Sequence, residues 1–169
     1  MCIRNRGHSI ECRIYAEDPY TIGMPSTGKL GYQHWPAGPG RRFDVAFAAG
    51  DSVSPYYDSM IAKVIVWDET RTRALQKMQR VLEDCVIFGV KTNIPLLQKI
   101  LMHPEFVNGS YNTQFMAKNF PEGLPVEELS ELETAFAQKA WREVSGGKVA
   151  IGNSSPSISS PFLEHWRQA

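Results

Sequence analysis

Residues 8–15 alternate between apolar and polar side chains with a period of two. One side of this segment carries His8, Ile10, Cys12 and Ile14, and the other carries Ser9, Glu11, Arg13 and Tyr15. Such alternation is typical of a strand with one face in the core and one face in solvent. Glu11 and Arg13 are neighbours on the polar face, so the pattern alone predicts an exposed ion pair. Asp18-Pro19 favours a turn after the strand.

Further strands are expected over residues 30–35, 41–47, 59–67 and 86–88. The segment 59–67 is almost continuously apolar, which favours a strand covered on both faces. Lys63 interrupts the run and needs either a route to solvent or a partner, with Asp58 and Glu11 as candidates. An amphipathic lysine at a sheet edge is the alternative interpretation.

Helical periodicity follows the long strand. Apolar residues recur at three- and four-residue spacing through Leu75, Met78, Leu82 and Cys85, and Asp68 suits the N-cap of this helix. A second helix over 94–102 is expected to be capped by Thr92 or Asn93, and a short third helix covers 113–119. Antiparallel strands with helices packed on them predict an α+β fold.

The composition and charge pattern of the sequence change near residue 124. Acidic residues at the start and cations at the end of 125–144 predict a helix that complements its own dipole. A stretch rich in serine, glycine and proline follows, as in a linker. We therefore divide the chain into a domain over 1–123, a C-terminal helix over 124–145, and a linker or the start of a further module over 146–169.

Composition excludes several classes of function. Eighteen basic and eighteen acidic residues cancel, which argues against a footprint for nucleic acid or for an anionic membrane, and no apolar run is long enough to span a bilayer. The cysteines and histidines lack metal-ligand spacing, so no metal site is expected. Cys12 and Cys85 fall in apolar patterns, which favours buried thiols in a reducing compartment. The glycines of residues 36–40 lack the GxxxxGK[ST] pattern of a phosphate loop.

Five blocks of sequence resemble the C-terminal domain of biotin carboxylase, in the same order and at similar spacing. They are GHSIECRIYAEDP, MPSTGKL, PAGPGRR, PYYDSMIAKVIVW and GVKTNIPLL. The resemblance runs from about Arg6 to Gly123. It implies an α+β domain in which an antiparallel sheet packs with helices, within an enzyme that carboxylates biotin with ATP and bicarbonate. We expect the chain to belong to a longer protein.

The resemblance assigns the catalytic role to Arg13, the arginine of the ECRI block. Removing a proton from the ureido nitrogen of biotin leaves negative charge on the ureido oxygen, as a biotin enolate. A guanidinium fixed beside that oxygen stabilises the charge as it develops. The competing interpretation is structural, with Arg13 paired to Glu11 and only ordering the sheet.

Two further roles follow from the resemblance alone. The arginine after the glycine-rich loop lies at the interface between two carboxylases in the family, which implies Arg42 here. Arg41 stands where the family often has an aliphatic residue, so the register of the match is open at this position. The family's GxxxTxF segment closes over adenine, and Gly109, Thr113 and Phe115 fit it. Thr113 is thus the expected ATP contact, with an ordinary helix-start threonine as the alternative.

The resemblance also implies cofactors and partners. These are biotin on a carrier domain, ATP with Mg²⁺ or Mn²⁺, an upstream ATP-grasp domain, a carboxyltransferase subunit and a second carboxylase. No phosphate loop or pair of metal carboxylates is recognisable here, so we expect this chain alone to be inactive and to bind no nucleotide tightly. The expected location is the cytoplasm, or the mitochondrial matrix in a eukaryote. The alternatives are a non-catalytic assembly module and the C-terminal domain of another ATP-grasp ligase.

Overall fold

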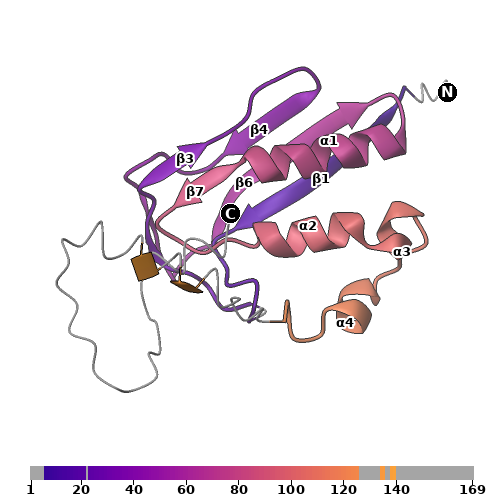
Figure 1. The fold of residues 1–169 in the computed structure, drawn as a ribbon. Helices are drawn as coiled ribbons and strands as arrows, with labels where there is room; N and C mark the ends of the chain where they lie inside the picture. The colour runs from indigo at the N-terminus through magenta and orange to yellow at the C-terminus, as the bar shows by residue number, and fades with distance from the viewer. Residues whose placement is uncertain (1–5, 22, 126–133, 136–137, 140–169) are drawn as a thin grey trace. The chain divides into compact units, whose positions relative to one another are not determined.

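A computed structural model describes residues 6–21, 23–125, 134–135 and 138–139. The chain divides into two units, residues 1–124 and 125–169, and the first holds all the elements discussed below (Figure 1). Of the helix predicted over 124–145, Thr134, Ala135, Gln138 and Lys139 are described and helical. Leu124 and Pro125 are described and are not helical, and the other residues of 126–145 together with the stretch 146–169 lie outside the described residues.

The centre of the first unit is a three-stranded antiparallel sheet in the order β1-β6-β4. β1 spans His8–Tyr15, β6 spans Met60–Asp68 and β4 spans Arg41–Val45. Two smaller antiparallel pairs complete the strands: β2 (Gly28–Lys29) with β5 (Ser52–Val53), and β3 (Tyr32–His34) with β7 (Val86–Phe88). The predicted α+β class with antiparallel strands is confirmed, with β3 and β4 shorter than expected.

Among the described residues of the first unit, four helices follow or interleave with these strands. α1 spans Arg71–Asp84 and packs on β1 and β6, as Figure 1 shows, while α2 (Ile94–Met102) packs beside α1. Two short helices, α3 (Pro104–Val107) and α4 (Phe115–Asn119), complete the unit. The N-cap of α1 is Thr70, whose hydroxyl accepts from the Arg73 amide, so the prediction that Asp68 caps this helix is wrong. Asp68 is the last residue of β6 instead.

The core lies between the sheet and α1. Ile10, Cys12 and Ile14 of β1 pair in register with Val66, Val64 and Ala62 of β6, and all six side chains are buried. Ala74, Leu75, Met78, Val81 and Leu82 of α1 are buried against them, as the helical periodicity predicts. This alternation on β1 agrees with the sequence pattern.

The expectation that β6 is covered on both faces is wrong. Its second face carries Lys63 and Ile65, which are half-buried, and Trp67, which is 46% exposed. Neither candidate partner reaches Lys63, because Glu11 pairs with Arg13 and the Asp58 carboxylate accepts from the Met60 amide. Within the described residues Lys63 forms no ion pair, and its place in the central strand excludes the sheet-edge alternative.

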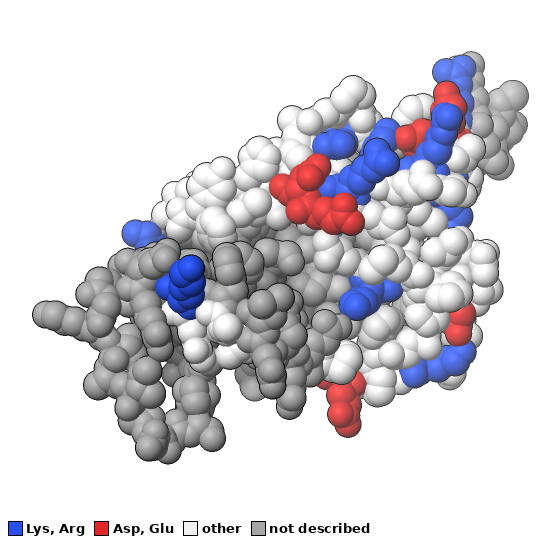
Figure 2. All heavy atoms as spheres, viewed as in Figure 1, with Lys and Arg blue, Asp and Glu red and all other residues white. Residues whose placement is uncertain are grey.

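The surface carries both signs of charge. On the face drawn in Figure 2, basic and acidic side chains are interspersed rather than gathered into one field. None of the described helices is long and apolar enough to cross a membrane. Across the same residues, no three His, Cys, Asp or Glu side chains form a group that could hold a metal ion.

Candidate functional site

One face of the three-stranded sheet is occupied by charged residues, and we call it the charged face: Glu11, Arg13, Arg42, Asp44 and Lys63. The strand register arranges them in two rows. Arg13 and Asp44 both pair with Lys63, and Glu11 and Arg42 both pair with Ile65. Cross-strand partners share a face, so Arg13 and Arg42 lie on the same side of the sheet. Sequence spacing did not reveal that the two arginines share a face, because β6 lies between β1 and β4 in the sheet.

Arg13 extends its guanidinium from the middle of β1. Its Nε donates to Glu11 Oε1 at 3.0 Å, and the two side chains are 57% and 42% exposed. Hydrogen bonding to Glu11, then to Tyr15, raises the pKa of Arg13 above its ordinary value, so the side chain stays charged. The predicted ion pair is present, and its exposure limits what it contributes to stability. The guanidinium also remains accessible to a ligand.

Asn93 was expected as a helix cap, and the structure assigns it a different contact. It occupies the N-cap position of α2 but makes no capping hydrogen bond with its side chain. The carboxamide lies against the backbone of β1 on either side of Ile14 instead. Sequence reasoning named Asn93 but missed its contact with β1, because Asn before a helix ordinarily indicates a cap.

The loop before β4 separates its two arginines onto opposite faces. The Arg41 guanidinium turns back to the Pro36 carbonyl at 3.2 Å, and its strand partner is the buried Val66. Arg42 is on the charged face, where Nε and Nη2 donate to the two oxygens of Asp44 at 2.9 and 3.0 Å. Arg41 therefore occupies the inward position that suits an aliphatic residue, and Arg42 is the outward arginine.

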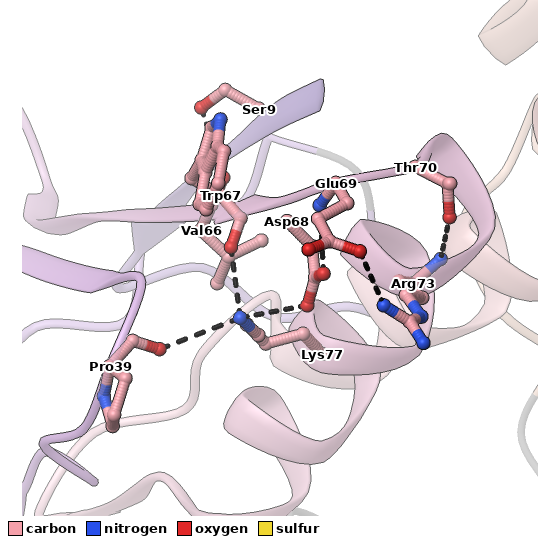
Figure 3. A network of polar contacts seen from close by, with 9 residues as sticks. All are labelled: Ser9, Pro39, Val66, Trp67, Asp68, Glu69, Thr70, Arg73 and Lys77. Atoms are coloured by element: carbon pink, nitrogen blue, oxygen red, sulfur yellow. Dashed lines mark hydrogen bonds and ion pairs between the residues drawn. The ribbon is translucent and has the colours of Figure 1, made fainter. Parts of the chain in front are cut away.

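Lys77 of α1 connects the loop before β4 to the end of β6 through polar contacts (Figure 3). Its ammonium lies 2.8 Å from Asp68 Oδ2 and donates to the carbonyls of Trp67 at 2.9 Å and Pro39 at 3.5 Å. The hydrogen bond from Lys77 is the main cause that lowers the pKa of Asp68. Gly40 has a φ of +67°, and a Cβ there would lie 2.6 Å from the Trp67 carbonyl oxygen, so this close approach requires glycine.

Thr113 lies away from the sheet, in the segment between α3 and α4. Its side chain is exposed, and it precedes α4 rather than starting that helix. Phe115 is buried, with its ring in contact with those of His103 and Tyr111, and Tyr111 stacks on Phe106 at 4.8 Å between centroids. Aromatic packing thus fixes both sides of Thr113 and presents it at the surface.

Comparison with known proteins identifies the family. The model of the biotin carboxylase C-terminal domain matches residues 11–118. The chain is 46% identical over 116 residues to a biotin carboxylase of Haemophilus influenzae and 41% identical over 129 residues to the mitochondrial propionyl-CoA carboxylase alpha chain of Sus scrofa. These alignments cover 69% and 75% of this chain, but only 26% and 18% of those proteins.

Solved structures agree with the sequence comparisons. The biotin carboxylase domain dimer of the Hydrogenobacter thermophilus 2-oxoglutarate carboxylase, in complex with MgADP, ADP and bicarbonate, superposes with a TM-score of 0.69 at 41% identity. That superposition covers 75% of this chain and 28% of the other. The chain thus spans between 18% and 28% of the length of the relatives named here.

Proposed function

Because the chain belongs to the biotin carboxylase C-terminal domain family, we propose that it serves as that domain in a biotin-dependent carboxylase. The observation that carries this proposal is an exposed, permanently charged Arg13 on the polar face of β1, within the matched residues 11–118. The relatives include a biotin carboxylase and a propionyl-CoA carboxylase chain, both ligases. In the complete carboxylase, ATP and bicarbonate would supply the carboxyl group that is transferred to biotin.

Arg13 is proposed to stabilise the negative charge that develops on the ureido oxygen of biotin. Three features of the side chain support this role: its accessibility, its fixed charge and its planar fork of donors. Glu11 accepts from Nε and Tyr15 is a second partner, and the five N–H donors of a guanidinium exceed what these two partners use. A positioned cation acts most strongly where charge is greater in the transition state than in the ground state.

Arg42 is proposed to contribute to a twofold interface between two carboxylases. It is 72% exposed, held by Asp44, and follows a loop secured by Lys77. An ordered, exposed arginine of this kind suits an interface, since little side-chain freedom remains to be lost on association. A homologous biotin carboxylase domain is a dimer in its solved structure.

Thr113 is proposed to lie against the adenine of ATP, with the segment from Gly109 to Phe115 covering the base. The exposure of Thr113 on a segment fixed by Phe115 and Tyr111 supports this role. The described residues contain no group of acids or histidines that fits a metal ion, so we assign no ligand of Mg²⁺ or Mn²⁺ here.

The remaining partners follow from the same proposal. An upstream ATP-grasp domain would supply the phosphate and metal sites, a carrier domain would deliver biotin, and a carboxyltransferase would use the product. By itself this domain is proposed to be inactive and to bind nucleotide weakly. The relatives include bacterial and mitochondrial enzymes, which suggests the cytoplasm or the mitochondrial matrix.

A domain exchange tests the proposed function directly. Residues 6–124 would replace the matching domain of the Haemophilus influenzae biotin carboxylase, and carboxylation of free biotin would be measured. We expect turnover that depends on ATP, bicarbonate and Arg13. A folded, dimeric chimera that binds ATP but cannot carboxylate biotin would contradict the proposal and favour a non-catalytic assembly module.

A further inference from the structure

The outer edge of β1 is the feature from which this inference starts. Within the part of the chain that the structure describes, β1 pairs on one side only in the order β1-β6-β4, so the backbone groups of its other side need partners outside the sheet. In antiparallel strands the N–H and C=O of one residue point the same way, and residues two apart share that direction. The edge groups of Arg13 and Tyr15 therefore face the same neighbour.

That neighbour is Asn93. Its Nδ2 donates to the Arg13 carbonyl at 3.1 Å, and its Oδ1 accepts from the Tyr15 amide at 3.0 Å. The Asn93 amide in turn donates to the Tyr15 carbonyl at 3.2 Å. A carboxamide presents one acceptor and a donor group, as a peptide unit does. The side chain of Asn93 thus takes the place of a missing strand partner over this short stretch.

The Asn93 contact lies where the pairing of β1 with β6 becomes irregular. The pairing of β1 with β6 is regular up to Ile14 and shifts between Ile14 and Tyr15. Such an irregularity changes the direction of nearby side chains unless something else holds the backbone. The Asn93 side chain hydrogen-bonds to the backbone of Arg13 and of Tyr15, one residue on either side of Ile14. Asn93 thus contacts the backbone from which the Arg13 side chain projects, on the edge of β1 opposite to β6.

Asn93 itself is held firmly. Its neighbours Thr92 and Ile94 are buried, and the amide of Lys91 donates to Ser26 Oγ at 2.8 Å. The carboxamide of Asn93 is consequently fixed by the core on one side and by β1 on the other. Arg13, in contrast, has its guanidinium in an exposed pair with Glu11, which constrains it weakly. Tyr15, the other partner of the guanidinium, follows the irregularity in the β1–β6 pairing, so the placement of Arg13 depends on the backbone of this stretch.

We propose that Asn93 is a positioning residue for Arg13, acting through the two hydrogen bonds of its carboxamide to the backbone of β1. The inference rests on the proposed function of Arg13 in biotin carboxylation. Asn93 touches no reacting atom in this account. It keeps the guanidinium aimed at the ureido oxygen, where a displacement of about 1 Å can cost roughly a hundredfold in rate.

The test compares four variants in the complete carboxylase: Asn93→Ala, Asn93→Asp, Arg13→Ala and the double variant Arg13→Ala with Asn93→Ala. Asn93→Asp keeps an acceptor for the Tyr15 amide and loses the donor to the Arg13 carbonyl, so it reports on the contact if the alanine variant folds poorly. Gln33→Ala is the matched control. The carboxamide of Gln33 also donates to a carbonyl, that of Phe47, and accepts from Trp35 Nε1, on β3 and outside the three-stranded sheet.

We expect both Asn93 variants to lower kcat for free biotin by about ten- to a hundredfold, with KM for ATP unchanged. Gln33→Ala should lower the melting temperature to a similar extent and leave kcat unchanged. In the Arg13→Ala background, Asn93→Ala should cause no further loss, because the two residues act as one unit.

Two results separate the possible failures. If Arg13→Ala is strongly impaired but both Asn93 variants retain wild-type kcat, or if the losses multiply in the double variant, the positioning role is wrong and the function of Arg13 stands. If Arg13→Ala keeps normal turnover, the proposed function of Arg13 fails, and the positioning role fails with it.

Discussion

The two faces of the three-stranded sheet are made by the same strands and differ in almost every physical respect. The covered face carries Ile10, Cys12 and Ile14, packed on α1. The charged face carries Glu11 and Arg13 from the same strand, in an exposed ion pair. Burial of apolar side chains stabilises the domain, whereas exposed ion pairs contribute little to the free energy of unfolding.

This difference indicates which substitutions should change the stability of the domain and which should change its chemistry. A substitution on the covered face should change the free energy of unfolding. A substitution on the charged face leaves the fold intact and acts on what the face binds. The following predictions test that separation.

The largest effect is expected on the covered face. Ile14 is fully buried, so Ile14→Ala should lower the free energy of unfolding by about 2–5 kcal/mol through lost contacts and the cavity left behind. Ile65→Ala, on the other face of the sheet, is the control and should cost clearly less because Ile65 is half-buried. Urea denaturation of both variants measures the difference, and equal losses would remove the distinction between the faces.

On the charged face, Arg42→Glu should weaken association rather than folding. Reversing this charge breaks the bidentate pair with Asp44 and sets two carboxylates side by side. We expect dimer dissociation constants in the complete carboxylase to rise about thirtyfold, or about 2 kcal/mol. Sedimentation equilibrium provides the measurement, with Arg73→Glu, on the exposed surface of α1, as the control. An unchanged dissociation constant for Arg42→Glu would exclude Arg42 from the interface.

Thr113 extends the comparison to an exposed residue outside the sheet. Thr113→Trp should raise KM for ATP about tenfold, about 1.4 kcal/mol, by blocking the approach of adenine. The melting temperature should not change, since the side chain is exposed. Steady-state kinetics with ATP varied would check this, using Met116→Trp in exposed α4 as the control. A normal KM would make Thr113 an ordinary surface residue.

The smallest effect is expected for Lys63. It lies directly across from Arg13 on one side and from Asp44 on the other. Like charges at opposed positions destabilise a sheet, and the attraction to Asp44 is reduced because both oxygens of that carboxylate already accept from Arg42. Lys63→Met should therefore be neutral or stabilise the domain by up to about 1 kcal/mol, in contrast to any truncation on the covered face. Lys29→Met, on the exposed surface of β2, serves as the control. A clear destabilisation by Lys63→Met in thermal unfolding would show that Lys63 supports the sheet.

The sequence predicted the covered face well because period-two and helical patterns report directly on burial. It failed for β6, where an apolar run suggested two covered faces, because periodicity cannot tell whether a second layer exists. It also assigned Asp68 to a helix cap that Thr70 occupies. For α2 it offered Thr92 or Asn93, and Asn93 is the N-cap residue although its side chain binds elsewhere. A residue's position before a helix does not reveal a competing partner. Lys77 and β1 are those partners, and both are distant in sequence. Arg13, Arg42 and Thr113 came from family resemblance, and their roles remain predictions.

The central claim is that Arg13 serves chemistry and not stability, and one paired measurement addresses it. kcat for free biotin and the melting temperature would be recorded for Arg13→Ala and Arg13→Lys in the complete carboxylase. We predict that Arg13→Ala loses roughly 10²–10³ in kcat, about 3–4 kcal/mol, at a near-normal melting temperature, and that lysine restores only part of the rate. Retention of most biotin-dependent turnover by Arg13→Ala would contradict the claim and leave Arg13 as one half of a surface ion pair with Glu11.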